Sequence, residues 1–269
     1  MNYKLLFPTY RNRYLFVRDR LREFAPETGW GNGLNLGTGE GDYDPMIARH
    51  CAELTACDIN ERDIAFARAL NEGIPGIRYE VQDALALSFP ADRFDFLVSV
   101  DVMEHVGDPA RMTAEIGRVL RPGGLAFITF PQLYFPWTYD PINRLLSFFT
   151  GRRISQGAYA FGHEYLIDGA DFRRWAEASG LEVLREQNLS GHLVALLEMY
   201  WTGWLQRIFK DNAGNVSTGN EKGVKLRPSL QESPLVGLTD LLIRIDRFLF
   251  GRGRHSVGKG FVVRKTTSM

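Results

Sequence analysis

The residues best suited to holding a ligand form a glycine loop that follows an apolar segment. Gly37, Gly39 and Gly41 are spaced as GxGxG, which allows tight backbone turns and a close approach to a ligand. The oxidoreductase dinucleotide fingerprint is GxGxxG, so this loop differs from it by one residue. The loop also carries three acidic residues, Glu40, Asp42 and Asp44. Carboxylates at this place favour a cationic ligand over a pyrophosphate.

Two further acidic residues follow the next two predicted strands. Asp58 lies 21 residues after Gly37, the separation at which a carboxylate meets the hydroxyls of a ribose in this architecture. Asp83 follows the third predicted strand, where an adenine amino group could donate a hydrogen bond to it. The three chain segments are therefore expected to converge on one nucleoside-containing ligand.

These features carry a resemblance to a known family. Residues 33–106, with Arg118–Gly124 (RVLRPGG), resemble a class I S-adenosylmethionine-dependent methyltransferase, and the likeness extends over roughly residues 30–190 and the last strand. It implies S-adenosylmethionine as cofactor, with the glycines at its methionine part, Asp58 at its ribose, and Asp83 and Ala84 at its adenine. The expected cofactor-binding residues are Asn35, Gly37, Thr38, Gly39, Gly41, Asp58, Ile59, Asp83, Ala84 and Asp101.

One position departs from the family pattern. The family usually has Asp or Glu where this chain has Asn35, a position linked to the amino group of the cofactor. Asparagine accepts a hydrogen bond without carrying a charge. We therefore expect at most a weakened cofactor affinity, which Asn35→Asp would alter.

Methyl transfer from a sulfonium is an in-line displacement that requires a positioned nucleophile and, where needed, removal of its proton. The catalytic candidates are Glu104 and His105, after the fourth predicted strand, and His163, in a later insertion. Histidine exchanges a proton readily near neutral pH. The alternative is that Glu104 and His105 hold their own loop and that His163 is structural.

Asp101, Glu104 and His105 also resemble the acid-xx-Glu-His cluster of metal-assisted quinone-precursor O-methyltransferases. Carboxylates and an imidazole can bind a hard divalent ion. We assign no metal ligand, and loss of activity in EDTA with recovery in magnesium would argue for one.

The chain around these residues alternates between strand and helix patterns. Such alternation predicts parallel pairing through right-handed crossovers, and hence a Rossmann-like, doubly wound α/β sheet. The resemblance adds that strands six and seven form a reversed hairpin, which makes the last strand antiparallel. Strands are predicted at 33–36, 53–57, 77–81, 94–100, 125–130, 181–189 and 260–265, and helices at 44–50, 60–72, 109–120, 167–179, 192–209 and 235–250.

We expect one methyltransferase domain over residues 1–269, with its core at about 30–130, 166–189 and 257–266. Residues 131–165 form a predicted lid insertion rich in aromatic residues, which suits an apolar or ring-bearing acceptor. Residues 190–256 form a helical insertion between strands six and seven. Long connections of this kind usually carry function.

The helical insertion contains an apolar stripe. Leu238, Leu241, Ile245 and Phe248 share one face of the helix predicted at 235–250, and charged residues lie opposite. Such a stripe either packs on its own domain or forms an interfacial membrane patch or a homodimer surface. The second alternative predicts a lipid-linked or otherwise hydrophobic small-molecule acceptor.

Composition limits the remaining function classes. Lys plus Arg and Asp plus Glu are both 32, so no net positive charge attracts a phosphate backbone and we expect no nucleic-acid partner. Two cysteines do not make a disulfide framework or a zinc site. With no sign of a signal peptide or membrane span, we expect a cytoplasmic protein, with possible peripheral contact at the inner membrane face. The competing interpretations are a nicotinamide-dependent oxidoreductase and a non-catalytic Rossmann-like binding scaffold.

Overall fold

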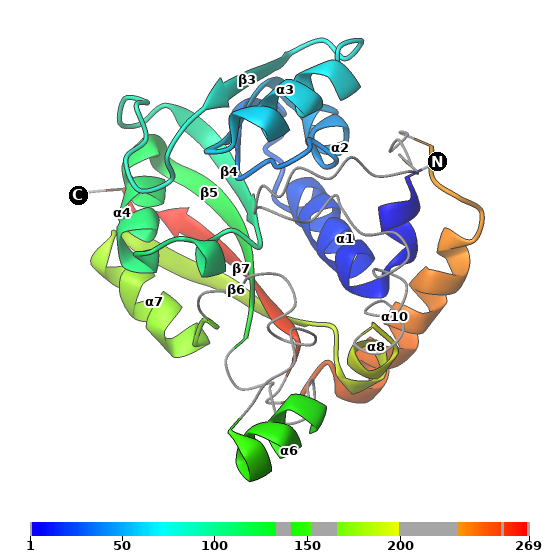
Figure 1. The fold of residues 1–269 in the computed structure, drawn as a ribbon. Helices are drawn as coiled ribbons and strands as arrows, with labels where there is room; N and C mark the ends of the chain where they lie inside the picture. Colours follow the sequence, from blue (N-terminus) through cyan, green and yellow to red (C-terminus); the bar gives the residue numbers. More distant parts are fainter. Residues whose placement is uncertain (1, 133–140, 152–165, 199–230, 254–255, 268–269) are drawn as a thin grey trace. The chain divides into compact units, whose positions relative to one another are not determined.

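The computed structural model describes residues 2–132, 141–151, 166–198, 231–253 and 256–267. Its centre is a seven-stranded sheet with the order β3-β2-β1-β4-β5-β7-β6 (Figure 1). The strands are β1 (Trp30–Leu36), β2 (Cys51–Asp58), β3 (Ile77–Val81), β4 (Phe94–Val100), β5 (Leu120–Pro131), β6 (Leu181–Leu189) and β7 (Gly258–Lys265). All seven predicted strands are confirmed in their predicted order.

The pairing of the strands brings the predicted ligand-binding segments together. β1 pairs in parallel with β2 and β4, and β2 pairs in parallel with β3. Leu36 lies opposite Cys57, so the glycine loop and Asp58 leave the sheet side by side. β7 is antiparallel to the other strands, which confirms the predicted mixed sheet.

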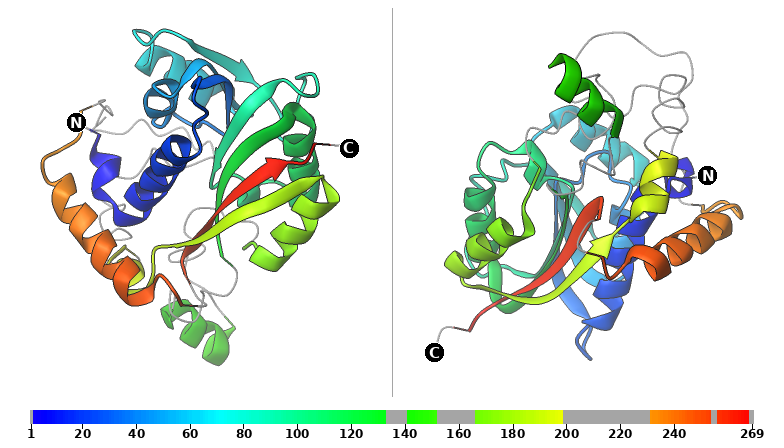
Figure 2. Two further views of the ribbon diagram at one scale, coloured as in Figure 1. Left: turned by 180° about the vertical axis from the view of Figure 1, so that it is seen from behind. Right: turned by 90° about the horizontal axis from the view of Figure 1, so that it is seen from below.

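Helices cover both faces of the sheet. α4 and α7 pack against each other on one face, while α2 and α3 lie against β2 and β3 on the other (Figures 1 and 2). The helices are η1 (Tyr3–Leu6), α1 (Pro8–Glu23), α2 (Asp44–Ala48), α3 (Glu61–Leu70), η2 (Met103–His105), α4 (Pro109–Val119), α6 (Pro141–Thr150), α7 (Gly169–Ala178), α8 (His192–Leu197) and α10 (Val236–Phe250).

The helix starts follow the predicted capping chemistry. The side chains of Asn60, Asp108 and Asp168 accept backbone N–H groups in the first turns of α3, α4 and α7. In the core, the ring of Phe261 stacks on that of Phe130 with their centroids 5.4 Å apart, and its centroid lies 4.7 Å from that of Phe172. β7 is thus fixed in the core by aromatic packing as well as by its strand pairing.

Several elements differ from the sequence-based prediction. α1 and α6 were not predicted, since their apolar residues are interrupted by arginines in one case and lie in an irregular insertion in the other. β5 begins at Leu120 rather than at 125, with a register irregularity between Phe94 and Phe96 of its neighbour. The Arg121–Gly124 segment therefore belongs to the start of β5.

The contacts divide the chain into two compact units. Residues 13–131, 167–187 and 259–269 form one, which contains the predicted cofactor residues, and 1–12, 132–166 and 188–258 form the other. The second unit thus collects the N-terminal residues and most of both predicted insertions. The single-domain boundaries remain a prediction. No helix in the described part of the chain is long and apolar enough to span a membrane.

Candidate methyl-transfer site

The glycine loop is fixed against both neighbouring strands. The N–H groups of Gly37 and Thr38 donate to the carbonyl oxygen of Cys57, at 2.8 and 2.9 Å. Gly37 has a φ of +78°, and a Cβ there would lie 2.2 Å from a methyl carbon of Val102. Only glycine fits this position, because both the conformation and the contact exclude a side chain. The contact also places the loop after β4 directly against the glycine loop.

Asp58 braces the same loop from the end of β2. One of its carboxyl oxygens accepts the Gly39 N–H at 2.9 Å and the other accepts the Asn60 N–H at 3.0 Å. A carboxylate has about four acceptor positions, so these bonds leave capacity for ribose hydroxyls. The next side chain, Ile59, is 69% exposed, which provides an apolar surface beside this carboxylate.

Asn35 is held by the buried carboxylate of Asp44, a contact that was not predicted from the sequence. Its Nδ2 donates to Asp44 Oδ1 at 2.6 Å and to Thr38 Oγ1 at 3.2 Å. Thr38 Oγ1 and the Tyr79 hydroxyl also donate to Asp44, at 2.8 and 2.9 Å. Burial raises the pKa of Asp44 to about 6, against the opposing effect of these hydrogen bonds. With its amide nitrogen committed, Asn35 presents its amide oxygen as the remaining acceptor.

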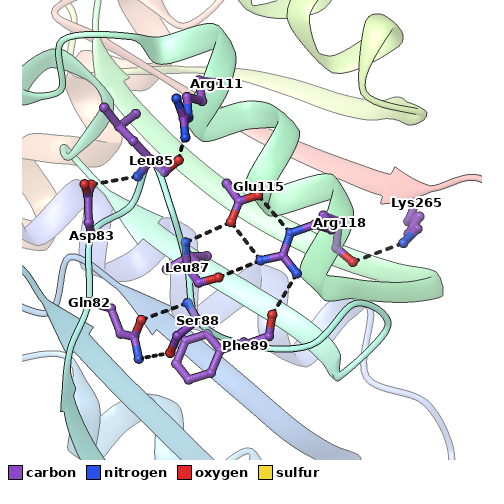
Figure 3. Close-up of polar contacts among 10 residues, drawn as sticks. All are labelled: Gln82, Asp83, Leu85, Leu87, Ser88, Phe89, Arg111, Glu115, Arg118 and Lys265. Atoms are coloured by element: carbon purple, nitrogen blue, oxygen red, sulfur yellow. Dashed lines mark hydrogen bonds and ion pairs between the residues drawn. The ribbon is translucent and has the colours of Figure 1, made fainter.

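The predicted adenine-binding residues lie in the loop that follows β3. Asp83 accepts the Leu85 N–H at 2.8 Å, and Ala84 is buried. At the start of the loop, the Gln82 amide pairs with Ser88, through bonds of 2.7 Å to its hydroxyl and 3.0 Å from its N–H (Figure 3). The loop that carries Asp83 and Ala84 therefore has a closed, hydrogen-bonded conformation.

Side chains of α4 fasten this loop to the domain, as Figure 3 shows. Arg111 donates to the Leu85 carbonyl at 2.7 Å, and Arg118 donates to the carbonyls of Leu87 and Phe89 at 2.8 and 2.7 Å. Glu115 pairs with Arg118 and accepts the Leu87 N–H at 2.8 Å. Hydrogen bonds with a charged partner are the stronger ones. α4 thus positions the loop that carries the adenine candidates.

The proton-transfer candidates lie after β4. Glu104 is fully buried, and neither of its carboxyl oxygens has a hydrogen-bond partner on another residue within the described ranges. His105 Nε2 is 4.0 Å from Glu104 Oε1, and the His105 side chain is partly exposed. Burial, reinforced by the Asp101 carboxylate, raises the pKa of Glu104 well above its ordinary value. This environment favours the protonated, neutral form of the Glu104 carboxyl group.

Asp101 has structural partners of its own. Its side chain pairs with the buried Arg13 of α1 and accepts the Thr129 hydroxyl at 2.9 Å. Although burial alone would lower the pKa of Arg13, the Asp101 carboxylate raises it above the ordinary value. Asp101 also has a φ of +53°, which orients the start of the loop. This ion pair ties Asp101 to α1, so a direct cofactor contact remains a prediction.

His163 and most of the aromatic lid lie outside the described residues. Within the residues that are described, no group of three or more His, Cys, Asp or Glu side chains is arranged to hold a metal ion.

The family comparison adds the deciding observation. Residues 34–128 match a family model described as "Methyltransferase domain", and this segment runs from the glycine loop to β5. Residues 34–128 therefore form a methyltransferase domain, in agreement with the predicted class I, S-adenosylmethionine-dependent family. The match covers neither predicted insertion, because both lie beyond residue 128.

Individual relatives agree with the domain assignment. A "Ubiquinone biosynthesis O-methyltransferase" of Coxiella burnetii (strain Dugway 5J108-111) is 29% identical over 154 residues, 56% of this chain. The chain spans 63% of the length of that relative. Among solved structures, the N-methyltransferase NodS of Bradyrhizobium japonicum, in complex with S-adenosyl-L-homocysteine, has a TM-score of 0.52 at 20% identity, covering 70% of this chain and 83% of that one.

The fold by itself does not define the reaction. The [4+2]-cyclase SpnF has a TM-score of 0.58 at 17% identity, over 94% of this chain and 80% of that one. The reaction of this methyltransferase domain must therefore be argued from its own side chains.

The residues of the domain fit S-adenosylmethionine. Gly37, Gly39 and Gly41 all have positive φ, and a Cβ on Gly39 would meet nothing within 4 Å, so the loop is open to a ligand there. The Asp58 carboxylate and the exposed Ile59 supply partners for a ribose and an adenine. When bound, this cofactor supplies an electrophilic methyl group. The binding role of each residue remains a prediction.

Several residues of the domain escaped the sequence analysis. Arg13 was missed with α1, for which Pro8 at the first helical position and the spacing of Val17 and Leu21 were the available signals. Tyr79 and Asn71 were missed because they reach the loop through side chains, with Asn71 Nδ2 donating to Tyr79 at 2.8 Å and to the Gly41 carbonyl at 3.0 Å.

The Asp44 network changes the result expected for Asn35→Asp. A carboxylate at position 35 has no hydrogen to donate to Asp44, so two carboxyl groups would meet where one bond of 2.6 Å now lies. We expect the variant to lose about 1–3 kcal/mol of unfolding free energy and to bind S-adenosylhomocysteine no more tightly. Urea unfolding and calorimetry measure the two quantities.

The exchanged variant Asn35→Asp/Asp44→Asn is the matched control, because it keeps one amide and one carboxylate. It should recover most of the stability lost in Asn35→Asp. Tighter binding by Asn35→Asp at unchanged stability would instead show that the domain simply lacks an acid at position 35.

Proposed function

We propose that this protein transfers the methyl group of S-adenosylmethionine to a hydroxyl oxygen on a hydrophobic, ring-bearing small molecule. The observation that carries the proposal is the buried carboxyl group of Glu104 beside His105, whose oxygens accept no hydrogen bond from another residue in the described part of the chain. Val102, two residues earlier, lies against Gly37 of the glycine loop. The pair is therefore close to the loop that binds the methionine part of the cofactor in this family.

A buried polar group without a partner is costly, and it is retained where a ligand supplies the partner. The raised pKa favours a protonated Glu104 carboxyl group, which can donate one hydrogen bond and accept others. In our proposal Glu104 binds the acceptor hydroxyl and His105 takes its proton. The oxygen then forms a bond to the methyl carbon while the carbon–sulfur bond breaks, and the electron pair of that bond stays on sulfur.

The acceptor class rests on two lines of support. The curated relatives are named ubiquinone biosynthesis O-methyltransferases, which favours oxygen as the nucleophile. Phe148 and Phe149 of α6, in the predicted lid, are both largely exposed and form an edge-to-face pair 5.1 Å apart. Exposed aromatic side chains of this kind suit an apolar ring on the acceptor.

A methyl-transfer assay with paired phenols tests the proposal. We expect mass spectrometry to detect O-methylated product from a catechol that carries an apolar chain, with a lower KM than for the same catechol without the chain. The matching compound without ring hydroxyls should give no product. Methylation of nitrogen or carbon, or binding of S-adenosylhomocysteine with no transfer to any phenol, would refute the O-methyltransferase assignment.

Two further arms of the assay address the alternatives. An assay in EDTA, with and without added magnesium, decides whether Asp101, Glu104 and His105 recruit a metal. Calorimetry with NADH tests the oxidoreductase alternative, for which no heat of binding is expected because the loop lacks the GxGxxG spacing.

A further inference from the structure

α10 exposes a large apolar face, while the face that packs inward is a mixture of polar and apolar residues. Thr239, Ile243 and Asp246 are buried at helical spacing. The outward face consists of large apolar side chains that are 44–89% exposed. They are Leu235, Leu238, Leu241, Ile245, Phe248 and Leu249. An ordinary surface helix buries its apolar stripe, whereas α10 leaves most of its large apolar side chains exposed.

Polar contacts within the same compact unit fix this orientation. Arg11 donates to both carboxyl oxygens of Asp240, at 2.8 and 3.1 Å, and the Thr239 hydroxyl donates to the Leu6 carbonyl at 3.2 Å. Arg247 donates to the side chain of Asn12 at 3.1 Å. The helix therefore cannot rotate its apolar face inward without breaking several charge-assisted hydrogen bonds.

Asp246 anchors α10 to the start of α8, its neighbour in the same unit. Its carboxylate accepts the backbone N–H groups of Gly191, Leu193 and Val194, the last two at 3.0 and 3.2 Å. These are the N–H groups that the first turn of a helix leaves without partners. α8 itself exposes Leu196 and Leu197, which adds to the apolar surface of this helix pair.

The charges at the edge of the apolar face indicate what covers it. Both acidic residues of α10, Asp240 and Asp246, are used in the inward contacts. The exposed charged side chains of the helix and of the turn after it are basic: Arg244, Arg247 and Arg252. A second copy of the same face would bring like charges together across a two-fold axis, whereas anionic lipid head groups complement them.

We propose that the outward face of α10 binds the surface of an anionic lipid bilayer, with the helix lying in the plane of the interface. The leucines and Phe248 insert among the acyl chains, while Arg244 and Arg252 contact lipid phosphates. This inference is independent of methyl transfer. It nevertheless suits the proposed acceptor, because a hydrophobic acceptor with an apolar chain resides in such a bilayer.

Flotation of the full-length protein with vesicles tests this inference. We expect the wild-type protein to float with vesicles containing phosphatidylglycerol, and much less with phosphatidylcholine alone. Leu241→Ser/Phe248→Ser should weaken the partition by about tenfold or more, and Arg244→Glu/Arg252→Glu should remove the preference for phosphatidylglycerol. All four side chains are exposed, so the variants should keep the thermal transition of the wild type.

The matched control is Phe66→Ser, which removes an exposed aromatic ring from α3 of the methyltransferase domain. Its flotation should equal that of the wild type. Recovery of wild-type protein in the vesicle-free fraction at low salt would overturn the proposal, as would flotation that Leu241→Ser/Phe248→Ser leaves unchanged. A wild-type dimer in light scattering that becomes monomeric in that variant, without vesicle binding, would assign the face to self-association instead.

Discussion

Asp58→Ala should weaken the binding of S-adenosylhomocysteine by about a hundredfold or more. The variant loses the carboxylate proposed to accept the ribose hydroxyls, and hydrogen bonds to a charged group contribute about 1.5–3 kcal/mol each. It also loses the two bonds that hold Gly39 and Asn60 at the edge of the sheet. Isothermal calorimetry on the purified variant measures the effect.

A ligand comparison separates the direct contact from the bracing of the loop. The wild-type protein should bind an S-adenosylhomocysteine analogue that lacks the ribose hydroxyls far more weakly than the natural ligand. Asp58→Ala should bind the two ligands about equally. Asp58→Asn, which keeps an acceptor for the Gly39 N–H, should fall between the two proteins. Equal discrimination by Asp58→Ala and the wild type would mean that Asp58 acts on the loop and not on the ribose.

Glu104→Gln should lower kcat by about a hundredfold while leaving the affinity for S-adenosylhomocysteine almost unchanged, because the amide alters the hydrogen bond that positions the acceptor hydroxyl, and misplacing a reactant by about 1 Å costs a factor of this size. The variant Glu104→Leu, by contrast, should be more stable than the wild type. Removing a buried carboxyl group that no other described residue hydrogen-bonds should raise the unfolding free energy by about 1–3 kcal/mol. Single-turnover kinetics and urea unfolding measure the two effects.

The pH dependence of stability gives a second readout for Glu104. Its folded-state pKa is raised, so the folded protein binds this proton more tightly than the unfolded chain does. The resulting stabilisation is complete below the ordinary pKa of glutamic acid and is lost as the pH rises through the folded-state value. Glu104→Gln should lack this decline.

The matched control for both measurements is Glu177→Gln, the same exchange at an exposed position of α7. It should keep the activity and the pH profile of the wild type. A Glu104→Gln protein with normal kcat would remove Glu104 from the proposed chemistry.

Local patterns were sufficient to predict much of this structure. The positions of the strands along the chain, the caps at Asn60, Asp108 and Asp168 and the glycine loop follow from chemistry within a few residues of each position. Such signals act over one helical turn or one strand, and a single sequence displays them directly.

The contacts that define the candidate site depend on residues distant in sequence. Tyr79 reaches Asp44 across 35 positions, and Arg13 reaches Asp101 from a helix whose buried face includes arginine instead of a continuous apolar stripe. Hydrogen bonds and ion pairs between residues distant in sequence leave no regular spacing from which they could be predicted. For the same reason the sequence could not decide whether the apolar stripe of α10 faces inward, since the answer depends on where Arg11 and Asn12 lie.

The position of β7 in the sheet affects how the protein folds during its synthesis. β7 separates β5 from β6 in space but follows both in sequence, so a nascent chain exposes the edge of β5 until residues 258–265 leave the ribosome. Translation of the segment between β6 and β7 takes roughly 3–14 s at about 5–20 residues per second. An open, apolar strand edge is a template for aggregation during that time. Slower growth or added chaperone should therefore increase the yield of folded protein more than a stronger promoter does.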